Sequence, residues 1–332
     1  MTKRTLIRDM LANQFVQGVF SIQNCQLGQT KTGKPYIKCL LGDRSKRVPG
    51  RMWNATEELF QSLPTDGFVY VEGQTQPYQG EMQIIVSVME PAKPSGEDLL
   101  ELLPRTENDI PGMLVEVARC ITSVTDPALR ALVQAYLDDT ELMAKFRQAP
   151  AAQNLHHAYI GGLLEHTLSL LRLGELFCKL YPQLNRDVVI VGLFIHDLGK
   201  CAELTWTTGF GYTDAGQLVG HIGQGLLWLQ QKADLCAQRG TKIPTATLLV
   251  LQHIVLSHHG KPEYGALKVP ATPEAIAVSL LDNLDAKMQM AMAAAARGES
   301  GEATVNLGGY FTEKVWALDT RIYRPDPTTV ED

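Results

Sequence analysis

The first quarter of the chain alternates apolar and polar residues in short runs, and turn residues separate these runs. An alternation with a period of two is typical of strands that bury one face. Asn54 is a suitable N-cap for a short helix over 55–63. The pattern predicts strands at 14–26, 34–41, 47–53, 68–74 and 82–88. Five short strands with one helix between the third and the fourth is the order of an all-β OB-fold barrel.

After residue 90 the pattern changes, first to a linker and then to helices. Four prolines and several acids between 90 and 111 indicate the linker. A period near 3.6 then predicts helices at 114–124, 128–137, 141–147, 163–180, 188–198, 216–239, 246–257 and 273–296. The last helix has a full start signal, with Thr272 as N-cap, Pro273 at its first position and Glu274 in its first turn. We therefore expect an OB-fold-like domain at 1–95, a linker and helical bridge at 96–145, and an all-α domain at 146–325.

Composition supports a globular protein of about two domains in 332 residues. Hydrophobic residues make up 45% of the chain, but no apolar run reaches the ~18 residues of a membrane span, so no membrane partner is expected. The basic start lacks the apolar stretch of a signal peptide. Six cysteines without a C-x-x-C pair indicate reduced thiols, and we expect a cytoplasmic protein.

Charge is unevenly distributed along the chain. Residues 1–95 hold 11 Lys and Arg against 8 Asp and Glu, a net charge of +3, whereas the remainder holds 19 against 28, a net charge of −9. A basic front end on an acidic body is compatible with a polyanion that binds at the front.

All eight histidines lie between 156 and 259, within the predicted helical half. His166 shares a helical face with leucines, His196 and Asp197 end an apolar run, and Asp282 lies mid-helix. A buried ionised Asp must be paired or bound to metal, because a lone buried charge is very costly. Each histidine alone fits a hydrogen-bonded core residue, but four such groups together form a ligand set for zinc, manganese or iron.

These four residues resemble the H…HD…D signature of the HD superfamily of metal-dependent phosphohydrolases, with the pair in the form FIHDLGK. The resemblance implies metal ligands at His166, His196, Asp197 and Asp282, and Asp197 also takes part in catalysis. Lys200 follows the pair at a spacing that lets it reach a phosphate oxygen.

HD enzymes with two metals add a middle His and a tandem His pair. By that resemblance His221, His258 and His259 complete a second metal position; the alternative is that one or two of them only hydrogen-bond to the ligands. The expected cofactor is one or two divalent ions per chain, Mn²⁺ first, with Fe, Co, Ni and Zn left open.

Four further runs resemble the YhaM family of bacterial 3′→5′ exoribonucleases, which also places an OB-fold before its HD domain. The runs are PAAQNLHHAYIGGLLEHTLSL, LQHIVLSHHGKPEYGA, TPEAIAVSLLDNLDAKM and FTEKVWALDTRIYRP. The resemblance implies hydrolysis of single-stranded RNA, with DNA left open, by metal-activated water. His156, His157 and Asp285, close to the expected ligands, are candidates for contact with substrate.

OB-folds hold single strands with a basic groove and stacking aromatic side chains. The candidates are Arg44, Lys46, Arg47, Arg51 and Trp53, with Tyr36 and Phe20 nearby; the alternative for each is a solvated loop or ordinary barrel core. The oligomeric state stays open, with a homo-oligomer possible.

Two other functions remain open at this point. In one, an HD hydrolase acts on free nucleotides or cyclic dinucleotides, and the barrel is a regulatory module. In the other, the chain binds nucleic acid without catalysis, which the intact ligand set disfavours.

Overall fold

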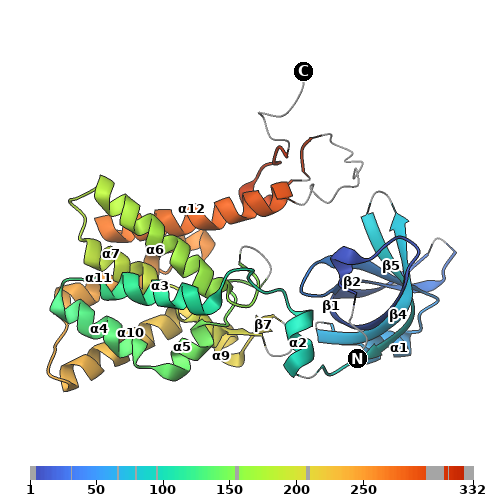
Figure 1. The fold of residues 1–332 in the computed structure, drawn as a ribbon, viewed down its shortest axis with the longest axis horizontal. Helices are drawn as coiled ribbons and strands as arrows, with labels where there is room; N and C mark the ends of the chain where they lie inside the picture. The colour runs from blue at the N-terminus through green and yellow to red at the C-terminus, as the bar shows by residue number, and fades with distance from the viewer. Residues whose placement is uncertain are drawn as a thin grey trace. The chain divides into compact units, whose positions relative to one another are not determined.

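A computed structural model describes residues 5–30, 32–65, 67–78, 81–94, 96–153, 157–206, 210–296, 310–312 and 314–324 (Figure 1). The chain forms two compact units. One comprises the chain up to residue 105 and from 291 onward, and the other comprises 106–206 and 210–290. Each unit is described by itself below.

The N-terminal unit contains a closed five-stranded barrel with the strand order β1-β2-β3-β5-β4. All its pairs are antiparallel except the parallel pair of β3 and β5, which closes the barrel. The short helix α1 follows β3 in the chain, as the sequence predicts, and this order confirms the OB-fold. The elements are η1 (Ile7–Asp9), β1 (Phe15–Gln29), β2 (Pro35–Gly42), β3 (Arg47–Trp53), α1 (Glu57–Ser62), β4 (Gly67–Tyr78), β5 (Glu81–Pro91) and α2 (Gly96–Leu102).

The inner faces of these strands form the core of the barrel. Ile37, Leu41 and Ile84 are fully buried there, because alternate side chains of a strand point to the same side. Phe20 is 1% exposed in the same core. Phe20 therefore packs the barrel core, which is the alternative that the sequence left open for it, and it is not available to stack on a base.

Two local features of this unit differ from the sequence pattern. The N-cap of α1 is Thr56, whose side chain accepts a hydrogen bond from the Leu59 N–H, whereas Asn54 has a φ of 55°. Asn54 takes the left-handed conformation that ends β3, which asparagine tolerates well, so the helix starts later than predicted. The predicted linker also contains a helix, α2.

The helical unit packs around α7 (Arg186–Ile195), which contacts α3, α4, α6 and α11 and is almost entirely buried (Figure 1). The other helices are α3 (Ile110–Thr122), α4 (Pro127–Leu137), α5 (Thr140–Phe146), α6 (Gly162–Leu180), α8 (Lys200–Glu203), α9 (Asp214–Leu218), α10 (Gly220–Gln238), α11 (Thr245–Ser257) and α12 (Pro273–Ala296). Two short strands, β6 (Leu204–Thr205) and β7 (Gly211–Tyr212), form a small hairpin, and single 3₁₀ turns lie at η2 (Pro262–Tyr264) and η3 (Trp316–Leu318).

The segment 106–145, expected as part of a linker and bridge, belongs to the core of the helical unit. Ile121, Val124 and Leu132 are fully buried in one cluster with residues of α6, α7 and α11. Their amphipathic helices need this partner surface, which a bridge between domains would not provide.

The predicted helix at 216–239 is interrupted. It divides into α9 and α10 at Gly220, whose φ of 70° is a left-handed conformation that favours glycine. The predicted start of α12 is confirmed, because the Thr272 hydroxyl accepts a hydrogen bond from the Ala275 N–H at 3.1 Å. In the part of the chain that the structure describes, none of the helices combines the length and apolar character that crossing a bilayer requires.

Candidate metal centre

Five helices of the helical unit bring the predicted metal ligands to one place. His166 lies in the first turns of α6, His196 and Asp197 follow the end of α7, and His221 begins α10. The pair His258 and His259 follows α11, and Asp282 lies on α12. The ligand atoms form two groups, each within 4.8 Å, and Asp197 belongs to both groups.

The first group consists of His166, His196, Asp197 and Asp282. The Nε2 atom of His166 lies 3.2 Å from Oδ1 of Asp282, and Nε2 of His196 lies 3.4 Å from Oδ2 of Asp197. Both histidines are fully buried.

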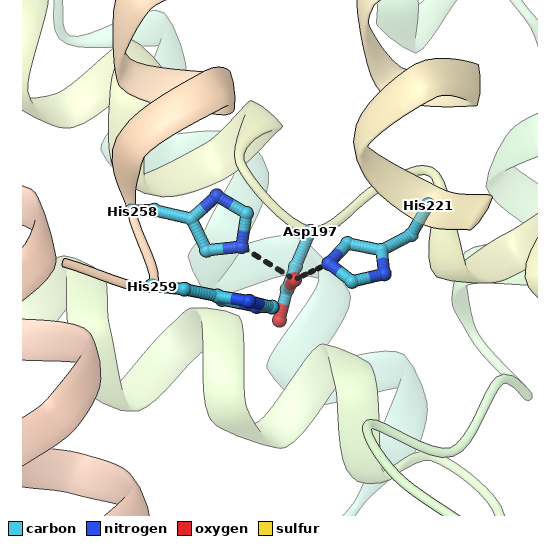
Figure 2. A group of neighbouring side chains, drawn as sticks. All are labelled: Asp197, His221, His258 and His259. Carbon is cyan, nitrogen blue, oxygen red and sulfur yellow. Dashed lines mark ion pairs between the residues drawn. The ribbon is translucent and has the colours of Figure 1, made fainter. Parts of the chain in front are cut away.

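The second group consists of Asp197, His221, His258 and His259 (Figure 2). The other carboxylate oxygen of Asp197, Oδ1, lies 3.4 Å from Nε2 of His258 and 3.7 Å from Nε2 of His221. Asp197 thus presents one carboxylate oxygen to each group.

Several of these atoms have no hydrogen-bond partner among the described residues, although they are buried. They are Nε2 of His196, His221 and His258, Nδ1 of His259, and Oδ1 of Asp197. A buried polar atom without a partner costs about 1–3 kcal/mol, so this concentration at one point indicates a ligand that satisfies them together. Imidazole nitrogen and carboxylate oxygen are donors that suit a divalent transition metal.

The outward ring nitrogen of four of these histidines is held by a neighbouring acceptor. His196 and His258 each end a helix and donate Nδ1–H to the carbonyl three residues before, on Leu193 at 2.9 Å and Val255 at 2.8 Å. Helix C-termini leave such carbonyls without intrahelical partners, so the same local geometry recurs at both ends. In each case Nε2 is left to face the group.

Carboxylates hold the other two histidines. Asp285 accepts from Nδ1 of His166 at 2.8 Å, and Glu203 accepts from Nδ1 of His221 at 2.9 Å. Sequence reasoning missed Glu203, because it lies between two predicted helices, at 188–198 and 216–239, and nothing in its spacing points to His221. Only the turn of the chain between α8 and α10 brings the two together.

The turn after Asp197 also requires a glycine. A Cβ atom on Gly199 would lie 2.0 Å from the carbonyl oxygen of His221. The close approach of this turn to α10 therefore explains the glycine of the FIHDLGK run and sets Asp197 against His221.

The electrostatics of the centre favour ionised carboxylates. Burial raises the pKa of Asp197, but the charges of Lys200 and His196 outweigh burial and hold it well below its usual range. Burial lowers the pKa of His166, yet hydrogen bonds to Asp282 and Asp285 raise it overall to about 9. Burial, together with the charge of His258, lowers the pKa of His259 to about 3.

Lys200 does not extend α7, because that helix ends at Ile195 and Lys200 begins α8. Its Nζ atom lies 2.6 Å from Oδ2 of Asp197. The side chain is 12% exposed and thus reaches the edge of the centre.

The residues expected to meet substrate in this unit lie in different settings. His157 is 3% exposed, with Nε2 3.1 Å from Oδ2 of Asp285 and Nδ1 2.8 Å from the Tyr159 hydroxyl. Asp285, also buried, lies behind His166. His156 lies outside the described residues.

The candidates in the barrel lie on β3 and in the loop before it. Arg51 lies 6.0 Å from the Trp53 ring centroid and 5.4 Å from that of Tyr78, and Tyr36 packs on Trp53 with ring centroids 5.3 Å apart. Trp53 remains 43% exposed. In the loop, Lys46 is exposed, whereas Arg44 pairs with Glu101 at 3.3 Å. Arg47 is half-buried and begins β3 on the same face as Arg51.

The chain is similar to several known proteins. The HD domain family model matches residues 163–287, which include all seven predicted ligands. The 3′-5′ exoribonuclease YhaM of Shouchella clausii is 31% identical over 324 residues, 96% of each chain. The 3′-5′ exoribonuclease YhaM of Bacillus subtilis is 33% identical over 309 residues, which are 92% of this chain and 93% of the relative's chain. The second OB-fold domain of replication protein A from Methanococcus maripaludis is 14% identical, with a TM-score of 0.23, and spans 28% of this chain and 98% of its own.

An HD domain that gathers this ligand set, joined to an OB-fold barrel, defines a metal-dependent phosphohydrolase with a barrel of the kind that binds nucleic acid. Within that class, the extent and identity of the match place the chain in the YhaM family.

Proposed function

We propose that this chain is a metal-dependent 3′→5′ exoribonuclease that hydrolyses the phosphodiester bonds of single-stranded RNA. The observation that carries the proposal is the convergence of unpartnered histidine nitrogens on the two oxygens of Asp197. The activity named for the family relatives supplies the substrate and the polarity.

Two metal positions are part of the proposal. His166, His196 and Asp282 would hold one ion, and His221, His258 and His259 would hold the other, with Asp197 belonging to both groups. Divalent ions there would act as Lewis acids toward the phosphate and activate water as the nucleophile. We propose Mn²⁺ as the native ion, because imidazole and carboxylate donors suit it; the donor set also accepts Fe, Co, Ni and Zn.

Other residues of the chain orient the metal ligands and contact the phosphate. Four of the five histidines, His166, His196, His221 and His258, are fixed in one orientation by acceptors at their outward nitrogens, so most of the ligand set is arranged before substrate arrives. Lys200, at the edge of the centre, supplies a cation to a phosphate oxygen and can donate a proton toward the leaving 3′-oxygen.

The barrel is proposed as the platform for the single strand. Arg51, Trp53 and Tyr36 form a cationic and aromatic strip on β2 and β3, and Arg47 continues it. Bases can stack on the exposed Trp53 ring while the arginines contact phosphates. Arg44 is a weaker candidate, because Glu101 already offsets its charge.

A cytoplasmic location is proposed as well. All six cysteines are free and buried, and none is used as a crosslink. Free thiols fit the reducing conditions of the cytoplasm.

The test uses purified full-length protein with Mn²⁺ and RNA labelled at its 5′ end. A 3′→5′ exonuclease shortens this RNA progressively and retains the label on a ladder of products. EDTA should stop the reaction and added Mn²⁺ should restore it. Immediate release of labelled mononucleotide would contradict the polarity, and no RNA degradation beside rapid hydrolysis of free or cyclic nucleotides would favour the other HD function.

A further inference from the structure

The two ligand groups of the candidate metal centre are supported by neighbouring residues in the same way. Each of the two ligand groups has one histidine held by a backbone carbonyl and one held by a carboxylate. In the first group the carboxylate is Asp285, behind His166. In the second it is Glu203, behind His221.

Asp285 is held firmly in its place. Its Oδ2 atom accepts from His166 at 2.8 Å and from Nε2 of His157 at 3.1 Å, and its Oδ1 atom accepts from the Ser169 hydroxyl. Tyr159 in turn lies against Nδ1 of His157 at 2.8 Å. With both oxygens engaged and only 5% of its surface exposed, Asp285 is positioned to orient His166 and has little surface for a substrate.

Glu203 is held with comparable precision at the end of α8. Its Oε1 atom accepts from both the backbone N–H of His221 at 3.1 Å and from Nδ1 of the same residue at 2.9 Å. Its side chain is 13% exposed. One oxygen thus fixes the backbone and the ring of His221 together.

A carboxylate behind a ligating histidine fixes its tautomer and raises its basicity, more strongly than a neutral carbonyl does. Since Asp285 lies on α12 and Glu203 on α8, the two carboxylates act on different histidines through separate contacts. We propose that Asp285 and Glu203 are positioning residues that tune the affinities of the two metal positions separately. This rests on the metal centre of the proposed function.

The experiment titrates metal-free, full-length protein with Mn²⁺ in the absence of nucleic acid and follows free Mn²⁺ by its electron paramagnetic resonance signal. The variants Asp285→Asn and Glu203→Gln keep the size of each side chain and remove its charge. Each should weaken one binding step about 10- to 100-fold, the usual effect of losing such a partner, and leave the other step unchanged. Ser169→Ala should weaken the same step as Asp285→Asn, by a smaller factor.

The same substitutions in a His258→Ala chain show which binding step belongs to which metal position. His258→Ala removes a ligand of the second group, so the remaining tight step belongs to the first. In that background Asp285→Asn should weaken the tight step further, and Glu203→Gln should not change it. Circular dichroism of each variant checks that it is folded.

The proposal is overturned if either variant weakens both steps equally, or if both variants bind Mn²⁺ like the unsubstituted chain. Because no RNA is present, these outcomes are independent of the proposed nuclease activity. A chain that shows the expected metal binding and yet fails to degrade RNA would contradict only the proposed function.

Discussion

The two carboxylate oxygens of Asp197 face the two ligand groups separately. Its neighbour in the chain, His196, serves only the first group, so the adjacent pair has unequal roles. Removal of the Asp197 charge should therefore affect both metal positions at once.

We expect Asp197→Asn to lower RNA hydrolysis by about a thousandfold or more, because metal ions contribute several kcal/mol of transition-state stabilisation and ~1.4 kcal/mol is tenfold in rate. Bound metal measured by mass spectrometry should fall in parallel. Asp234→Asn, an exposed residue of the same unit, is the matched control. Normal activity in Asp197→Asn would contradict the assignment of Asp197 as a metal ligand.

The number of ions is the second expectation at this scale. The two ligand groups predict about two metal ions per chain after loading and removal of excess, and about one in His258→Ala. Elemental analysis against protein concentration measures both. A single ion in the unsubstituted chain, kept in the variant, would leave His258 with only a hydrogen-bonding role.

Among the elements, α7 has most influence on the site, because it carries His196 and Asp197 at its end and lies in the core. Its N-terminus is fixed by Asp187, whose Oδ2 atom accepts from the backbone N–H groups of Thr125 and Asp126 at 2.7 and 2.9 Å. Burial raises the pKa of Asp187, but these hydrogen bonds outweigh burial and lower it.

We expect Asp187→Asn to reduce the stability of the helical unit at pH 7 by about 1–3 kcal/mol, because buried donors lose a charged acceptor. The pKa of Asp187 is lower in the folded chain than in the unfolded chain, where it is about 4. The stabilisation is therefore fully present above pH ~4, and it disappears as the pH falls through the pKa of the folded chain. The free energy of unfolding is measured with urea, in the presence of EDTA, at pH 7 and below pH ~4. The difference in this free energy between the variant and the unsubstituted chain should be smaller at the lower pH.

Asp138→Asn is the comparison, since Asp138 forms an exposed pair with Arg239 that solvent screens. It should change stability much less than Asp187→Asn does. An equal loss in both variants, or a difference that grows as the pH falls, would contradict the role given to Asp187.

For the whole molecule, the feature that matters is the separation of charge between its parts. Residues 1–95, which include the barrel, carry a net charge of +3, whereas residues 96–332, which include the helical unit, carry −9. We therefore expect the acidic part of the chain to repel a polyanion except at the candidate metal centre. Retention of a long strand then depends on the cations of the barrel.

We expect Arg47→Gln with Arg51→Gln, in the full chain, to weaken binding of single-stranded RNA. The slope of log K against log salt should become shallower by about 0.7 for each phosphate that the arginines no longer neutralise. Filter binding over a range of salt measures the slope. Arg44→Gln, with its charge already offset by Glu101, should change it least.

Hydrolysis of bis-p-nitrophenyl phosphate should stay normal in the Arg47→Gln and Arg51→Gln chain, because this small ester needs only the metal centre. If the slope of log K against log salt for RNA binding is unchanged in that variant, the strip on β3 is not the surface that binds single-stranded RNA.

The sequence by itself determined the fold class, the order of the barrel and the residues of the expected HD signature. Periodicity reports which side of a strand or helix is buried, and the adjacent pair His196 and Asp197 is a local motif that a few residues define. For the same reason Thr272 was identified as an N-cap, since its signal is local. Family membership agrees with both conclusions.

Only the tertiary structure decided what depends on contacts distant in the chain. The association of 106–145 with the core, the approach of Glu203 to His221, and the place of Asp285 behind His166 all join segments whose spacing carries no signal. The same holds for Asn54, whose left-handed backbone is set by the end of β3 and overrides its preference as a cap. Side-chain chemistry names the candidates for a site, but packing determines which of their atoms face one another.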